Sequence, residues 1–121
     1  MFSKTLLDHF ENPRNVGEVE AASAVVEAAN PICGDELRLS ARVLDGRLVE
    51  VRYQTRGCTA SIAAGSALTE LLMGRAAEGL QVTSSEIEDA VGGLPSTSKH
   101  AALLGVDAVR ALSAALQKGG S

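Results

Sequence analysis

The sequence predicts an α+β domain, with a three-stranded antiparallel sheet and helices packed on one face of it. Two observations support this class: the segment 36–44 alternates apolar and polar residues, and helical patterns dominate the chain after Gly57. Strands that come first and helices that follow favour helices gathered on one side of the sheet. A chain of 121 residues has the size of one domain. We therefore expect residues 1–121 to form a single domain, with the last few residues frayed.

A short helix is predicted near the N-terminus, in the stretch FSKTLLDHFENPRNVG. Ser3 has the residue type of a helix cap, and Pro13 cannot continue a helix. His9 lies off the apolar face of this helix, so we expect its side chain to be solvated. The apolar face itself is expected to carry Leu6, Leu7 and Phe10.

Three strands are predicted next. The stretch SAVVEAANP indicates a strand that ends at Pro31, and ELRLSARVL alternates as a half-buried strand does. Asp45-Gly46 is a strong signal for a tight turn, and LVEVRYQT follows it as the partner strand. In ELRLSARVL, the side predicted to be buried carries Leu37, Leu39, Ala41 and Val43, and the side in solvent carries Arg38, Ser40 and Arg42.

Helices are predicted for the rest of the chain. CTASIAAGSALTELLMG indicates a long helix that ends at Gly74, and its many small residues predict close packing against the sheet or another helix. TSSEIEDAVGG indicates a short helix in which Thr83 and Glu86 have the spacing of a capping box. LPSTSKHAALLGVDAVRALSAALQ indicates the last helix.

The composition argues against several classes of function. A net charge of -4 argues against binding the phosphates of nucleic acids, and 2% aromatic residues argue against stacking on bases. The chain opens with no signal region, and no apolar span approaches the roughly 20 residues of a membrane helix. We therefore expect a cytoplasmic protein without membrane or nucleic-acid partners. In that reducing compartment, its two cysteines favour ligand, nucleophile or core roles over a disulfide.

Three short stretches carry groups that can bind a metal. Cys33 and Asp35 lie in a turn between two predicted strands, Cys58 lies where a strand gives way to a helix, and His100 lies in the first turn of the last helix. Because the outer ends of a hairpin are neighbours, Cys33 and Cys58 are predicted to be close. Two thiolates, an imidazole and a carboxylate suit tetrahedral zinc, or iron in a sulfide cluster.

Each of these residues also has a structural interpretation. Cys58 can be a small apolar residue at the start of an Ala-rich helix, and Asp35 can be an ordinary turn residue. A lone histidine in the first turn of a helix, such as His100, is usually a surface residue. Cys33, between a proline and a glycine in a turn, fits a purely structural role least well. Spacing alone is a weak signal here, since the chain has no C-x-x-C pair.

The stretches LLDHFENPRNVG, NPICGDELRL and TRGCTASIAAGSALTE resemble signature sequences of the IscU/NifU-type iron–sulfur cluster assembly scaffolds. The resemblance extends from the first helix to about Leu112, in the same order and with the same spacing. It implies an α+β fold and the assembly of a 2Fe–2S cluster from iron and from sulfur supplied by a cysteine desulfurase. It further implies that the cluster passes to iron–sulfur acceptor proteins, and that the same site can bind a zinc ion.

The resemblance also implies roles for individual residues. Cys33 and Cys58 match the first two cysteine ligands of the family, and His100 matches the histidine that precedes the third. Asp35 matches the aspartate that tunes how firmly the cluster is held. Ala101 stands where the family has its third cysteine, and alanine can neither bind a metal nor carry a persulfide.

Two functions therefore stay open. The first is a scaffold or carrier that holds a 2Fe–2S cluster, or its iron precursor, on Cys33, Cys58, His100 and Asp35. The alternative is a paralogue that binds one zinc or iron ion and assists or regulates a cysteine desulfurase without building a cluster. A fold remnant without metal is disfavoured, because all four candidate ligands are present. None of these is an enzyme in the strict sense, and the sequence contains no phosphate loop and no Ser/His/Asp arrangement.

Overall fold

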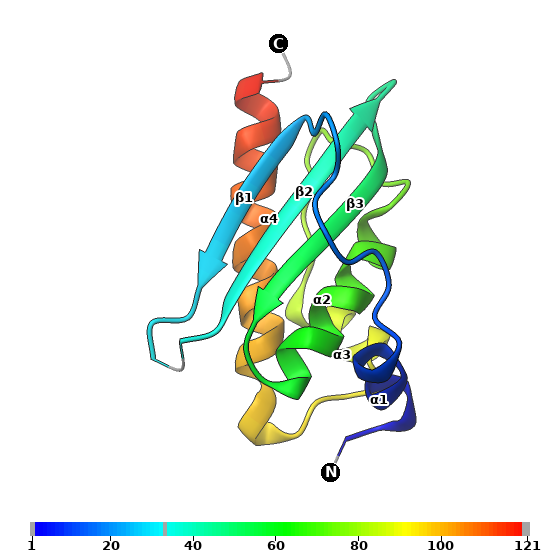
Figure 1. Cartoon of the computed structure of the whole chain (residues 1–121). Coiled ribbons are helices and arrows are strands. Elements are labelled where there is room, and N and C mark those ends of the chain that lie inside the picture. The colour runs from blue at the N-terminus through cyan, green and yellow to red at the C-terminus, as the bar shows by residue number, and fades with distance from the viewer. Residues whose placement is uncertain (1, 33, 120–121) are drawn as a thin grey trace.

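Three strands form one antiparallel sheet in the order β1-β2-β3, and helices pack against one of its faces (Figure 1). The computed structural model describes residues 2–119 except residue 33, so that Met1, Cys33, Gly120 and Ser121 lie outside the described residues. The predicted α+β class is confirmed. The elements are α1 (Lys4–Glu11), β1 (Ala24–Ala29), β2 (Glu36–Leu44), β3 (Arg47–Arg56), α2 (Thr59–Leu72), α3 (Ser84–Ala90), a 3-10 turn (Ser96–Ser98) and α4 (His100–Gly119).

Strands β2 and β3 form a hairpin whose register brings their outer ends together. Asp45 and Gly46 connect the strands with φ angles of 54° and 77°, which are the left-handed values of a tight two-residue turn. The pairing begins beside this turn and ends with Glu36 opposite Arg56. The residues just before β2 and just after β3 therefore lie side by side, at the lower end of the sheet in Figure 1.

Helix α2 lies close to β3 because a glycine faces the sheet. A Cβ atom placed on Gly65 would lie 2.5 Å from Cδ2 of Tyr53, which is too close for any real side chain. The hydroxyl of the buried Tyr53 donates a hydrogen bond to the carbonyl of Ile62 at 3.0 Å, which fixes the ring in this position. Burial of the phenol raises the pKa of Tyr53 to about 12. The close packing predicted from the small residues of this helix is confirmed.

Helix α4 completes the layer by packing against β1 and β2, and α3 packs against both α2 and α4. The capping box of Thr83 and Glu86 at the start of α3 is present as predicted. In the described part of the chain, no helix has both the length and the apolar character that crossing a membrane requires. Helices α2 and α4 both begin at the same end of the sheet (Figure 1).

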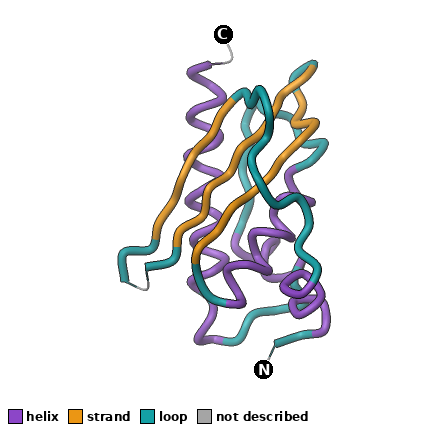
Figure 2. Tube along the Cα trace, viewed as in Figure 1, coloured by secondary structure: helices purple, strands orange, loops and turns teal. Residues whose placement is uncertain are grey.

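The outer face of the sheet is less exposed than the alternation in 36–44 predicts. Ser40 was expected in solvent, but its side chain is 1% exposed. The loop between α1 and β1 crosses this face (Figure 2), and the amide of Val19 donates a hydrogen bond to Oγ of Ser40 at 2.8 Å. The same loop pairs with the edge of β3, where the amide of Gly17 donates to the carbonyl of Tyr53. The prediction for Ser40 is wrong because a distant segment covers it.

The buried face of α1 also differs from the prediction. Leu6 is fully buried, but Leu7 and Phe10 are 38% and 36% exposed, whereas His9 is only 6% exposed. Nδ1 of His9 lies 2.8 Å from Oγ of Ser66 on α2, and this contact satisfies the imidazole inside the helix interface. The expectation of a solvated His9 is therefore wrong.

We expect the free energy of unfolding to fall as the pH is lowered through the range in which His9 titrates. Desolvation, and to a smaller extent the charge of Arg14, lowers the pKa of His9 from its ordinary value of 6.5. The unfolded chain then takes up the proton at a higher pH than the folded chain does. The stabilisation is complete above the ordinary pKa, near pH 6.5, and is lost as the pH drops below it.

Urea unfolding between about pH 7.5 and pH 5.5 measures this dependence. A His9→Asn variant keeps a hydrogen-bonding group near Ser66 but has no titrating ring, so its stability should vary less with pH. Equal pH slopes in the two proteins would contradict the assignment to His9.

Candidate metal-binding site

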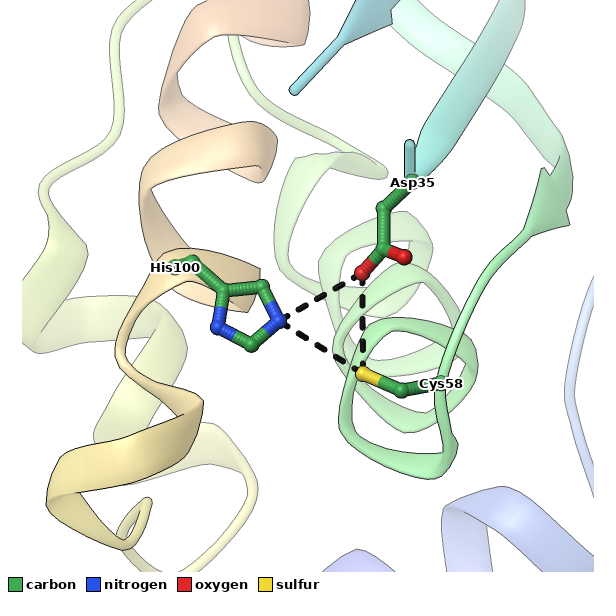
Figure 3. A group of neighbouring side chains, drawn as sticks. All are labelled: Asp35, Cys58 and His100. Atoms are coloured by element: carbon green, nitrogen blue, oxygen red, sulfur yellow. Dashed lines mark hydrogen bonds and ion pairs between the residues drawn. The ribbon is translucent and has the colours of Figure 1, made fainter. Parts of the chain in front are cut away.

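Three side chains with metal-binding groups meet at the end of the sheet where α2 and α4 begin (Figure 3). Asp35 directly precedes β2, Cys58 is the N-cap residue of α2, and His100 is the first residue of α4. The hairpin register explains the first contact, because Asp35 and Cys58 lie just beyond the paired ends of β2 and β3. The packing of α4 against the sheet brings His100 to the same place.

The three ligand atoms lie at nearly equal distances from one another. Nε2 of His100 is 3.4 Å from Oδ2 of Asp35. Sγ of Cys58 is 3.6 Å from the same carboxylate oxygen and 3.6 Å from Nε2 of His100. Within the described residues, this is the one group of three or more His, Cys, Asp or Glu side chains with ligand atoms gathered in this way.

Asp35 is positioned by a hydrogen bond of its backbone and by close packing beside its carboxylate. The amide of Asn30 donates to the carbonyl of Asp35 at 2.8 Å, and Gly34, the residue before Asp35, adopts a φ of 73°. Beside the carboxylate, a Cβ atom on Gly57 would lie 2.8 Å from Cγ of Asp35. A glycine before Cys58 therefore leaves the space that the carboxylate fills.

Ser61 belongs to the same site and was not predicted from the sequence. Its side chain is 3% exposed, and its hydroxyl lies 2.6 Å from Oδ2 of Asp35 and 3.4 Å from Sγ of Cys58. Ser61 follows Cys58 by three residues, which places both on one face of α2. That spacing is the signal in the sequence that could have identified it.

Burial and charge make the site suitable for a cation. Asp35 is 6% exposed, whereas Cys58 is exposed and the side chain of His100 is 28% exposed. A buried carboxylate costs free energy unless hydrogen bonds or a positive charge compensate for it. A metal ion between the three ligand atoms would supply that charge, and the exposed thiol leaves the site open on one side.

The structure thus brings together three of the four residues predicted to bind a metal. These are Asp35, Cys58 and His100. Cys33, the fourth, lies outside the described residues, so its contribution stays a prediction. Ala101 is 3% exposed and belongs to the hydrophobic core.

Comparisons with known proteins agree on one family. A family model described as NifU-like N terminal domain matches residues 1–118. The chain is 41% identical over 111 residues to the iron-sulfur cluster assembly scaffold protein IscU 1 of Archaeoglobus fulgidus, covering 91% of this chain and 72% of the relative. It is 38% identical over 109 residues to the IscU scaffold protein of Aquifex aeolicus, covering 88% of this chain and 69% of the relative.

Longer relatives and solved structures extend the comparison. The nitrogen fixation protein NifU of Cereibacter sphaeroides is 48% identical over 97 residues, which cover 79% of this chain and 39% of that protein. A solved Fervidobacterium islandicum structure, described as a candidate iron–sulfur cluster assembly scaffold for the SUF system, has a TM-score of 0.73 at 20% identity. That match covers 91% of this chain and 94% of the other. At this identity, the likeness concerns the fold alone.

Proposed function

Because the chain belongs to the NifU-like N-terminal domain family, we propose that it is an iron–sulfur cluster assembly scaffold whose cargo binds at Asp35, Cys58 and His100. The observation that carries the proposal is the meeting of a carboxylate, a thiol and an imidazole, 3.4 to 3.6 Å apart. Cys33, two residues before Asp35, is the expected fourth ligand.

The spacing of the three ligand atoms fits a single metal centre. Bonds of about 2.0–2.3 Å in a tetrahedral arrangement put the ligand atoms of one zinc ion roughly 3.3–3.7 Å apart. The three distances here fall within that range. One corner of the tetrahedron is then left for Cys33 or for a sulfide.

A 2Fe–2S cluster makes a different demand on the same residues. Each of its irons binds both bridging sulfides, so only two positions on each iron remain for protein ligands. The site offers three protein ligands, Asp35, Cys58 and His100, which is one more than a single iron of the cluster accepts. Building a cluster therefore requires one of these ligands to dissociate or to bind the second iron instead. The arrangement therefore supports a state in which one iron ion is bound before the cluster forms. The cluster that is then built is the cargo.

The partners follow from this chemistry. A scaffold that starts from an iron ion needs a source of sulfur, and we assign this role to a cysteine desulfurase. The exposed Cys58 is open to such a donor, and iron–sulfur acceptor proteins are the expected recipients. The alternative, a zinc-binding paralogue that only regulates the desulfurase, is not favoured by relatives named as scaffolds. We assign no catalytic residue, and a cytoplasmic location stays a prediction.

Anaerobic reconstitution tests the proposal. The protein is incubated with ferrous iron, cysteine, a cysteine desulfurase and a dithiol reductant, which supplies the electrons that convert persulfide sulfur to sulfide. Iron, zinc and acid-labile sulfide are then measured. We expect about two irons and two sulfides per site, as in a 2Fe–2S cluster. His100→Ala should lower both, whereas Lys99→Ala, a change at the neighbouring residue outside the site, should lower neither. Tightly held zinc without sulfide would favour the alternative, and no metal at all would reject both functions.

A further inference from the structure

We propose that Ser61 is a positioning residue of this site, whose hydroxyl holds Oδ2 of Asp35 toward Cys58 and His100. This inference rests on the proposed function, because it requires Asp35 to bind the metal. Ser61 lies in the first turn of α2 and is almost fully buried. Its oxygen is 2.6 Å from Oδ2, a short distance for a hydrogen bond between two oxygens.

The hydrogen-bonding capacity of a hydroxyl decides the direction of this bond. Ser61 has one proton to donate, and an ionised carboxylate can only accept. The proton of Ser61 therefore goes to Asp35. The single proton of the Cys58 thiol is then available to Oδ2 of Asp35 at 3.6 Å or to Oγ of Ser61 at 3.4 Å. A thiolate bound to a metal has no such proton. Loading the site thus removes the contact with Cys58 and leaves the bond from Ser61 to Asp35 in place.

The same carboxylate oxygen faces both other ligands. Oδ2 of Asp35 is the atom that lies 3.4 Å from Nε2 of His100 and 3.6 Å from Sγ of Cys58. A carboxylate oxygen carries two lone pairs, so the bond from Ser61 occupies one and leaves the other for a metal.

Gly57 restrains the carboxylate from a second side. The close approach of its backbone to Cγ of Asp35 limits how far the group can shift. Together with the hydrogen bond from Ser61, this contact restricts the carboxylate before any metal binds. Partners that orient a metal ligand in this way typically contribute 10- to 100-fold to metal affinity.

The small number of ligands gives this bond additional weight. Among the described residues the site offers three ligand atoms, so the placement of each one matters. A freely rotating aspartate would bind a metal weakly, because binding would have to restrict its rotation. The hydrogen bond from Ser61 already restricts this rotation in the metal-free protein, so metal binding costs less conformational entropy.

Cobalt(II) titrations against a competing chelator test the role of Ser61. Ser61→Ala should lower the affinity for cobalt about 10- to 100-fold. Ser66→Ala is the matched control: it makes the same change at a buried position of α2, where the hydroxyl contacts His9 and Arg14 instead of the site. Its affinity for cobalt should stay unchanged even if its melting temperature falls. Ser61→Thr, which keeps the hydroxyl, should restore part of the loss.

An Asp35→Ala background separates positioning from a general structural effect. If Ser61 acts through Asp35, adding Ser61→Ala to Asp35→Ala should cause no further loss of affinity. Both single variants should keep the thiolate-to-cobalt charge-transfer band, because Cys58 is intact, and both should change the ligand-field bands, which report the geometry around the cobalt. Unchanged affinity in Ser61→Ala, or an equal further loss without Asp35, would overturn the inference. Absence of cobalt binding in the unmodified protein would instead reject the metal site itself.

Discussion

Replacing Cys58 by alanine is expected to abolish tight metal binding and to leave the fold intact. The thiol is the one sulfur ligand among the three described ligand residues, and zinc and iron both bind thiolates strongly. Its loss should cost the metal-free fold little, because the side chain is exposed and makes no capping hydrogen bond to α2. Zinc at a hundredfold excess over its dissociation constant stabilises a protein by about 2.7 kcal/mol.

The measurement is the melting temperature with and without zinc. The unmodified protein and a Thr59→Ala control should melt at a higher temperature with zinc, whereas Cys58→Ala should show no shift. Metal-free melting temperatures should be similar in all three proteins. A full zinc shift in Cys58→Ala would mean that other residues hold the metal.

Replacing Gly65 by alanine is expected to lower the free energy of unfolding substantially. The new Cβ would overlap the ring of Tyr53, whose hydroxyl is bonded to the backbone of α2. Overpacking of this kind costs about 1–3 kcal/mol. In an unhindered helix, the same substitution stabilises by up to about 1 kcal/mol, so the sign of the change is diagnostic.

Urea unfolding of Gly65→Ala measures this loss, and Gly105→Ala is its matched comparison. A Cβ on Gly105 would lie 2.7 Å from Cδ1 of Ile87, the tip of a side chain that can rotate away. We therefore expect a smaller loss, or none, at Gly105. If Gly65→Ala were as stable as the unmodified protein, α2 and Tyr53 could not be packed as closely as they are in this structure.

Most of the fold was predictable from the sequence because its signals are local. The alternation in 36–44 coincides with β2, and Asp45-Gly46 forms the tight turn that its residue types favour. The capping box of α3 depends on two residues in one helical turn. The family resemblance is confirmed by the family model. It could be recognised from the sequence because it rests on contiguous motifs.

The errors share a different cause. Ser40 and His9 were both predicted to face solvent, and each is buried by a hydrogen-bonding partner that is distant in the sequence. Val19 lies 21 residues from Ser40, and Ser66 lies 57 residues from His9. Alternation and helical periodicity describe one element at a time, so they cannot show which segment will cover a polar side chain.

The candidate site was predictable to the extent that it depends on the ends of elements. Asp35, Cys58 and His100 each begin or precede a strand or helix, and the hairpin between the first two made their proximity foreseeable. Ser61 was missed because a serine within an Ala-rich helix has the composition of a packing residue. Its three-residue spacing from Cys58 places it on the same face of α2, but its bond to Asp35 depends on how the start of β2 is placed against that helix.

The three ligand residues are far apart in the chain, and this has a consequence for delivery of the cargo. Asp35 and Cys58 are 23 positions apart, and Cys58 and His100 are 42 apart. A metal bound to all three closes two loops at once, and loop closure withdraws conformational entropy from the unfolded chain. The loaded protein is then cross-linked in the way that a disulfide cross-links a secreted domain. When the cargo leaves, both cross-links are lost together, so each delivery returns the scaffold to a metal-free state that is easier to unfold than the loaded one.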